Sequence, residues 1–491
     1  MNIRINQRLL GFILLAFLFS CDKDFGDFNL NPDAVTQVDS KLLFSDAMVS
    51  TSAMDMEPRT NYFHAFMQYG FSGFWSGTNY NISDGIVQRY WNNFYQNPVK
   101  TIEFAINQLE GEPELVNTLS AARIWRVFLY QKLTDVYGDI PYSEAGKTFL
   151  TREFTPVFDS QQAIYTDLIN ELREAKAAFD TGARAVEGDQ FYGGDVDKWT
   201  RLANSLLLRI GLRLLKVDAT QANSLIQEAF NGGVMRNMGE SPILLHNEDR
   251  PSGYNFNLGD QQFQLHKTLV DHMKTTGDPR LRIYGAIHMD QQIISTDTST
   301  YEGYSFDGTD PAATVQVSFP IFRPATNPFF HFHYTQVELL LAEAAARGII
   351  ASDAADHFAK GIRAHMQSLS TFTTNPTIPE AEIDSYLANN PLPTGSLDEM
   401  VEAIATEFWV AGFLFDADEV WSNWRRTGYP DLTPNPNTLT GASDSPGRIP
   451  RKLPYPRREL DVNTTEVTRA LSNYNGQNDF NQSARVWWDV E

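Results

Sequence analysis

The chain has 491 residues, of which 42% are hydrophobic, so it is long enough to bury a large core. Its 61 Asp and Glu residues outnumber its 39 Lys and Arg residues, and the formal net charge is −22. An acidic surface of this kind repels polyanions, which argues against nucleic acid and anionic lipid headgroups as partners.

The first residues have the pattern of a leader that directs export. The segment MNIRINQR carries two arginines and no acid, and the apolar run Leu9–Phe19 is followed by Ser20 and Cys21. A helix needs about 20 apolar residues to cross a bilayer, so this run is too short to span one. It predicts a removed signal peptide at residues 1–20.

Cys21 is the only cysteine of the chain, and two interpretations of it compete. It is either a leftover thiol in a discarded or disordered leader, or the acylated first residue of a mature lipoprotein. The small Ser20 before it favours the lipoprotein, and so does the absence of a second cysteine, because a lone exported thiol would expose a reactive group. We therefore expect lipidation of Cys21, with enough acyl chains for stable anchoring.

Residues 21–491 predict one mainly α-helical domain, because apolar residues recur three or four positions apart over long stretches. This spacing is clearest in DVDKWTRLANSLLLRIGLRLLKV, and it recurs in AARIWRVFLYQKLTDVYG and HYTQVELLLAEAAARG. Gly138 and Gly348 are expected to end two of these helices, since glycine tolerates the left-handed conformation found there.

The stretch from Tyr334 to Leu369 predicts a helical hairpin. Ser352 or Asp353 can cap the second helix, and the unit spans about the 34 residues of a tetratricopeptide repeat. Further helical patterns follow it along the chain. The expected fold is therefore an irregular helical repeat of tetratricopeptide-like hairpins with long loops.

Long Gly-, Asn- and Pro-rich connections between the helices are candidates for a binding surface. In GFSGFWSGTNYNISDG the helical spacing breaks, and aromatic residues stand among Gly, Ser and Asn. An aromatic face packs on the C–H face of a sugar ring, and a neighbouring amide can bond its hydroxyls. The alternative is that these aromatics fold back onto the helical body. With a weaker second set in STYEGYSFDGTD, the predicted ligand-binding residues are Phe74, Trp75, Tyr80, Asn81, Tyr301 and Tyr304.

Motifs for catalysis, cofactors and metals are weak or missing. PYSEAGKT ends like a phosphate-binding loop but begins with proline, and GxGxxG, GxSxG and HExxH do not occur. His331 and His333 could ligate a metal with Glu338, although histidines satisfied in the structure are the better interpretation. Carboxylates are too abundant to nominate a glycosidase pair, which is defined by its spatial separation. We expect no catalytic residue, no cofactor and no metal.

The segment EVWSNWRRTGYP allows two roles for Arg425 and Arg426. They could form a fork that binds a carboxylate, or they could offset the dipole in the last turn of a helix. We favour the structural role. Asp416, Asp418 and Glu419 are near enough in sequence to be their expected partners.

Several motifs in one order resemble a known family. They are a leader ending in cysteine, then DFGDFNLNP, LTDVYGDIPYSEA, KWTRLANSLLLRIGLRL, YTQVELLLAEAAARG, NWRRTGYP and IPRKLPYPRREL. Together they resemble the SusD/RagB family of outer-membrane lipoproteins from Bacteroidota. The resemblance covers nearly all of the chain after the leader. It implies a mostly helical fold and anchorage to the outer membrane, facing outward.

The resemblance also implies a function. It implies that the protein captures a nutrient without catalysis and acts as a lid on a SusC-like TonB-dependent transporter. The expected nutrient is an oligo- or polysaccharide or another oligomer. Two alternatives stay open, a surface-anchored glycan hydrolase and a helical-repeat scaffold that binds only protein.

Replacing Cys21 by serine tests the lipid anchor. The variant is expected to leave the cell surface, because no acyl chain can then hold the acidic protein at the membrane. Surface labelling of intact cells, followed by washing, measures the fraction retained. Wash-resistant retention of a lipid-free Cys21→Ser protein would contradict the prediction.

Overall fold

Helices make up most of the chain in this computed structural model. The described residues are 38–52, 56–71, 76–148, 152–254, 263–289, 292–306, 314–440, 443–474 and 484–491. Ser40–Glu491 form one compact unit. The predicted leader and Cys21 lie outside the described residues. None of the described helices is both long and apolar enough to cross a membrane.

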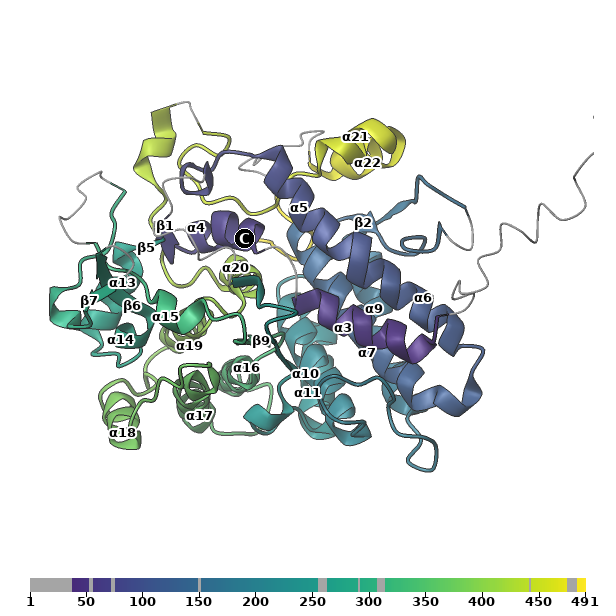
Figure 1. Cartoon of the computed structure of the whole chain (residues 1–491), viewed down its shortest axis with the longest axis horizontal. Helices are drawn as coiled ribbons and strands as arrows, with labels where there is room; N and C mark the ends of the chain where they lie inside the picture. Colours follow the sequence, from purple (N-terminus) through teal and green to yellow (C-terminus); the bar gives the residue numbers. More distant parts are fainter. Residues whose placement is uncertain are drawn as a thin grey trace, which may run out of the picture. The chain divides into compact units, whose positions relative to one another are not determined.

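The first half of the unit is a stack of helices, drawn in purple to teal in Figure 1, in which most helices pack on the next one in the chain. They are α3 (Ser40–Ser52), α5 (Asp84–Phe94), α6 (Lys100–Leu109), α7 (Val116–Tyr137), α9 (Gln161–Ala178), α10 (Val196–Leu214) and α11 (Ala219–Gly232). α7 ends at Gly138, whose φ of 79° confirms the predicted stop.

The second half adds the predicted hairpin and three more helices. α16 (Tyr334–Ala346) packs antiparallel to α17 (Ala354–Ser368), and the side chain of Asp353 accepts hydrogen bonds from two backbone N–H groups at the start of α17. α16 also packs on α10 and so joins the two halves. The next helices along the chain are α18 (Glu380–Asn389), α19 (Leu397–Ala411) and α20 (Ala417–Thr427). The predicted helical-repeat fold is confirmed.

Short strands and helices fill the connections. One sheet has the order β1-β5-β8-β6-β7, with β1 (Gly70–Phe71), β5 (Gln264–Leu265), β8 (Gln316–Val317), β6 (Gly285–Met289) and β7 (Gln292–Ser295). Two small antiparallel pairs are β2 (Ile140–Pro141) with β3 (Phe158–Asp159) and β4 (Ile243–Leu245) with β9 (Pro328–Phe330). The short helices are α4 (His64–Phe66), α13 (Lys267–Thr275), α14 (Leu281–Tyr284), α15 (Phe319–Phe322), α21 (Arg457–Val462) and α22 (Thr464–Leu471).

Buried ion pairs connect α20 to the helices around it. Lys132 of α7 lies 2.5 Å from Asp416, and Arg213 of α10 donates two hydrogen bonds of 2.7 and 2.8 Å to Glu419. All four side chains are buried. Charges removed from water are tolerated only with such partners, so these pairs fix how the three helices meet.

Arg425 and Arg426 have structural partners, as expected, but not the expected ones. Arg426 donates to both carboxylate oxygens of Glu343 on α16, and Arg425 donates to the carbonyl oxygen of Asp135 on α7. The prediction that the acidic residues at 416–419 would pair with them was wrong. Those residues lie at the opposite end of α20, about 9 to 15 Å away along the helix axis at 1.5 Å per residue.

Arg213→Ala tests how much the buried ion pairs contribute to stability. It leaves Glu419 and Asp135 without this guanidinium, so we expect the free energy of unfolding to fall by about 3–5 kcal/mol. Denaturant titration followed by circular dichroism measures the change. The control is Lys360→Ala, which breaks the exposed pair with Asp356 and should cost at most about 1 kcal/mol. Equal losses in the two variants would contradict the prediction.

Candidate functional site

The ends of several connecting segments, far apart in the sequence, meet at one sheet. Phe71 in β1 lies opposite Gln264 in β5, and Gln264 lies opposite Gln316 in β8. Backbone bridges add Tyr304 opposite His266. Figure 1 shows β1 and β5 side by side. We call this region the loop platform, defined as residues 70–71, 76–81, 263–266, 301–306, 314–317 and 435–437.

Two asparagines hold the loop platform together. The backbone N–H of Asn435 donates to the Tyr80 hydroxyl at 3.1 Å, and its side chain donates to the carbonyl oxygen of Thr78 at 2.9 Å. Two residues later, the Asn437 side chain donates to the carbonyl oxygen of Phe306 at 2.6 Å. One short segment therefore links 76–81 to 301–306. Sequence reasoning missed both residues, although they stand in the proline-rich stretch TPNPN.

The structure places two of the predicted ligand-binding aromatics in the core. The Tyr80 ring is fully buried and packs edge-on against Phe66, with 6.0 Å between ring centroids. Burial raises the pKa of its hydroxyl to about 12. Tyr301 is 1% exposed and donates a hydrogen bond to the carbonyl oxygen of Gly285. In this conformation neither ring has a face open to a ligand. For these two residues the structure agrees with the alternative interpretation, in which the loop aromatics fold back onto the helical body.

The other predicted residues divide into two groups. Asn81 and Tyr304 are half-buried at the loop platform. The Tyr304 ring lies beside His266 and Phe306, with ring centroids 6.3 and 6.5 Å away. Burial lowers the pKa of His266 to about 4, so this imidazole is neutral near pH 7. Phe74 and Trp75 lie outside the described residues.

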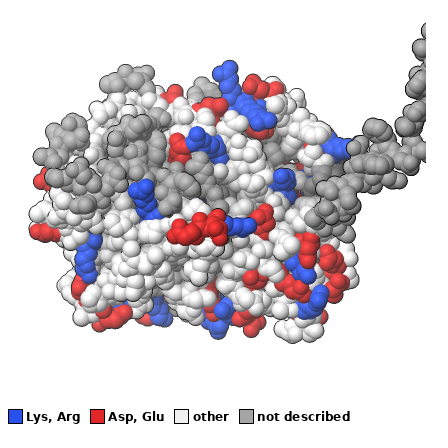
Figure 2. Space-filling view, in the orientation of Figure 1, with Lys and Arg blue, Asp and Glu red and all other residues white. Residues whose placement is uncertain are grey.

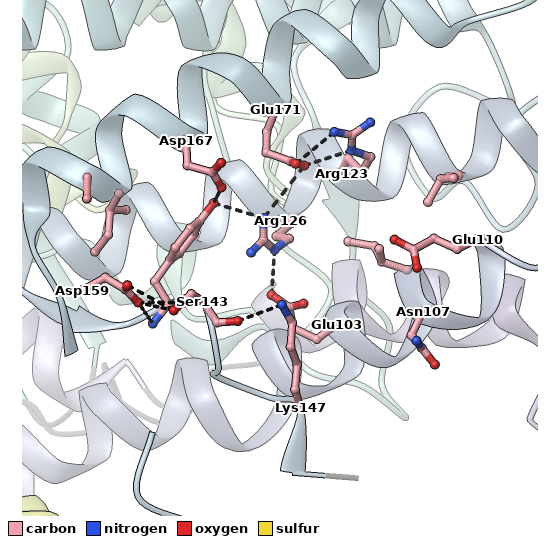
Figure 3. A pocket seen from close by; sticks show the side chains of 15 residues that line it. Glu103, Asn107, Glu110, Arg123, Arg126, Ser143, Lys147, Asp159, Asp167 and Glu171 are labelled. Atoms are coloured by element: carbon pink, nitrogen blue, oxygen red, sulfur yellow. Dashed lines mark hydrogen bonds and ion pairs between the residues drawn. The ribbon is translucent and has the colours of Figure 1, made fainter. Parts of the chain in front are cut away.

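A charged cavity of about 770 Å³ lies away from the loop platform, between α6, α7 and α9 (Figure 3). Its two arginines are paired with its glutamates. Arg126 donates to Glu103 at 2.6 Å, and Arg123 donates two bonds of 2.9 Å to Glu171. Against the effect of burial, these two arginines lower the pKa of Glu171. The pairs join the three helices and keep Glu171 ionised, which does not suit a general acid.

His331 and His333 are both core residues. Hydrogen bonds satisfy His333, as the favoured interpretation expected, but neither ring nitrogen of His331 has a partner among the described residues. His331 packs edge-on against Trp125, and the His333 ring accepts a hydrogen bond from the backbone N–H of Thr335 at the start of α16. Burial lowers the pKa of His333 to about 3. Over the described ranges, no group of three His, Cys, Asp or Glu side chains could hold a metal ion.

The surface charges are mixed on the face seen in Figure 2. Acidic and basic side chains lie there in small neighbouring groups, with uncharged surface between them. No broad basic area is visible among the coloured residues of this face.

Comparison with known proteins identifies the family. Residues 32–456 match the SusD-like family model, which is described as starch-binding and associating with the outer membrane. No curated protein matches the chain.

Solved structures with the same fold include three at TM-scores of 0.76 to 0.80, each covering 92% of this chain and 100% of its own. One is named a chitin-binding protein and is 30% identical to this chain, with a TM-score of 0.80. The others are a Bacteroidetes SusD-like protein at 24% identity and a SusD homologue from Bacteroides fragilis at 21%. The resemblance found in the motifs is therefore confirmed, and the chain belongs to the SusD-like family.

Proposed function

We propose that this protein is a non-catalytic, cell-surface lipoprotein that captures a glycan on the loop platform and delivers it to a SusC-like TonB-dependent transporter. The observation that carries the proposal is the meeting of distant segments at one small sheet, mounted on a helical body of the SusD-like family. Binding sites are commonly formed by loops that a rigid scaffold positions. The chitin-binding protein among the similar structures supports a glycan as the ligand class.

The binding residues in this proposal are Asn81 and Tyr304 of the loop platform, together with Phe74 and Trp75 from the segment 72–75 that connects two of its parts in the sequence. Aromatic faces pack on sugar rings, and the Asn81 amide offers both a donor and an acceptor to hydroxyls. The half-buried positions of Asn81 and Tyr304 support this assignment. The buried Tyr80 would act from below by fixing the segment 76–81 through its bond with Asn435.

The anchor in this proposal is Cys21, acylated after removal of residues 1–20. Asp22, Asp24 and Asp27 follow it directly and resemble the acidic export signal of surface lipoproteins in this family. The acyl chains would hold the protein at the outer membrane, with the loop platform accessible to glycans and to the transporter.

Trp75→Ala tests the proposed site. Loss of a stacked aromatic should weaken binding of N-acetylglucosamine or maltose oligomers by about 1–3 kcal/mol, with the fold unchanged. Isothermal titration of the purified protein measures the affinity. The control is Phe154→Ala, which removes an exposed aromatic outside the loop platform and should leave the affinity unchanged.

The same samples separate the proposal from its two alternatives. A binding protein shows saturable affinity, and the oligomers keep their length during long incubation. Shortening of the oligomers would support a hydrolase. A protein that copurifies with an outer-membrane transporter and binds none of the oligomers would instead be a scaffold. Unchanged affinity in Trp75→Ala would move the glycan site elsewhere.

A further inference from the structure

A small cavity beside the C-terminal part of α20 is lined by three arginines. Its volume is about 180 Å³, and Arg448, Arg451 and Arg485 line it together with Trp424. None of its lining residues belongs to the loop platform. Three guanidinium groups around one small cavity are unusual in a chain with a net charge of −22.

Arg451 is held rigidly in the cavity wall. It donates two hydrogen bonds of 2.8 and 2.6 Å to the buried Asp489, and a third of 2.6 Å to the carbonyl oxygen of Arg425. Its guanidinium also lies over the Trp424 ring, 4.9 Å from the centroid. Asp489 is shared with Arg485, which donates to it at 3.2 Å. One carboxylate therefore serves two arginines.

Two hydrogen-bonding groups of the wall have no partner within the described part of the chain. The Arg448 side chain is exposed and makes no ion pair or hydrogen bond there. The indole N–H of Trp424 is buried and has no acceptor. Because buried donors in proteins are almost always bonded, this N–H is a group that a ligand or a water molecule at the cavity wall could satisfy.

The surroundings of the cavity are electropositive. Glu491 adds a second acid at 3.0 Å from Arg485, but its side chain is largely exposed and screened by water. Burial lowers the pKa of the Lys216 ammonium; the charge of Asp489 opposes this, and the charges of Arg451, Arg426 and Arg485 add to it. The three arginines of the wall thus outnumber the one buried acid, Asp489. The local field therefore favours an incoming anion.

We propose that this cavity binds the carboxylate of a small molecule, no larger than one sugar ring. A guanidinium fork matches the two oxygens of a carboxylate, and Arg448 would close on a group that Arg451 and the Trp424 N–H bind from the wall. The cavity has about the volume of six water molecules, so it can hold at most one sugar ring. The site is independent of glycan capture on the loop platform, and uronic acids are ligands of suitable size.

Titration of the purified full-length protein with D-glucuronate, D-glucose and acetate tests the site. We expect glucuronate to bind and glucose, the same ring without the carboxylate, to bind at least about tenfold more weakly. Affinity should fall as salt is added. Acetate binding as tightly as glucuronate would show that the carboxylate alone is recognised, and weaker acetate binding would show that the ring contributes; both results support the proposal.

Two variants and one control assign the binding to the cavity. Arg448→Ala should weaken glucuronate at least about tenfold without affecting the fold, because this side chain supports nothing else in the described structure. Trp424→Phe keeps the ring under Arg451 and removes the N–H, so a smaller loss is expected. Arg250→Ala removes another exposed arginine outside the cavity and should change nothing. The proposal is overturned if glucuronate and acetate both fail to bind, if glucose binds equally well, or if Arg448→Ala retains full affinity.

Discussion

The buried charges at the start of α20 constrain how the helices of this protein meet. A carboxylate removed from water needs its cation at a defined position, whereas apolar contacts accept several alignments. Burial raises the pKa of Asp416, an effect that Lys132 opposes, and against the effect of burial Arg59 and Lys132 lower the pKa of Asp418. Lys132 on α7 must therefore lie beside Asp416, and Arg213 on α10 must lie beside Glu419. Any other alignment of these three helices would leave a charge buried without a partner.

The sequence predicts the helical frame well because helical periodicity is a local property. The stop at Gly138, the cap at Asp353 and the hairpin of α16 and α17 each depend on residues a few positions apart. The partners of Arg425 and Arg426 could not be found in this way, since Asp135 and Glu343 come from other helices. The sheet strands are also hidden, because most have two or three residues and so show no alternation of polar and apolar positions.

The candidate site was only partly predictable, for a related reason. The break in helical spacing after Gly70 correctly indicated a connection at the loop platform, but burial depends on distant residues. Tyr80 is covered by Phe66 and bonded by Asn435, and Tyr301 reaches the carbonyl oxygen of Gly285. The three arginines of the small cavity span 38 positions from Arg448 to Arg485, so no short sequence motif reveals the site.

The backbone pairing of β1, β5 and β8 has a consequence for how binding specificity can change. Ladder bonds between N–H and carbonyl groups are available to nearly every amino acid, so the seam that joins these strands places few demands on side chains. Residues carried by the segments beyond the seam are then free to diverge while the frame persists. This agrees with the solved structures that share only about a fifth to a third of their residues with this chain and yet superimpose closely on it. A change in the bound ligand would then require different residues at the loop tips, while the fold stays the same.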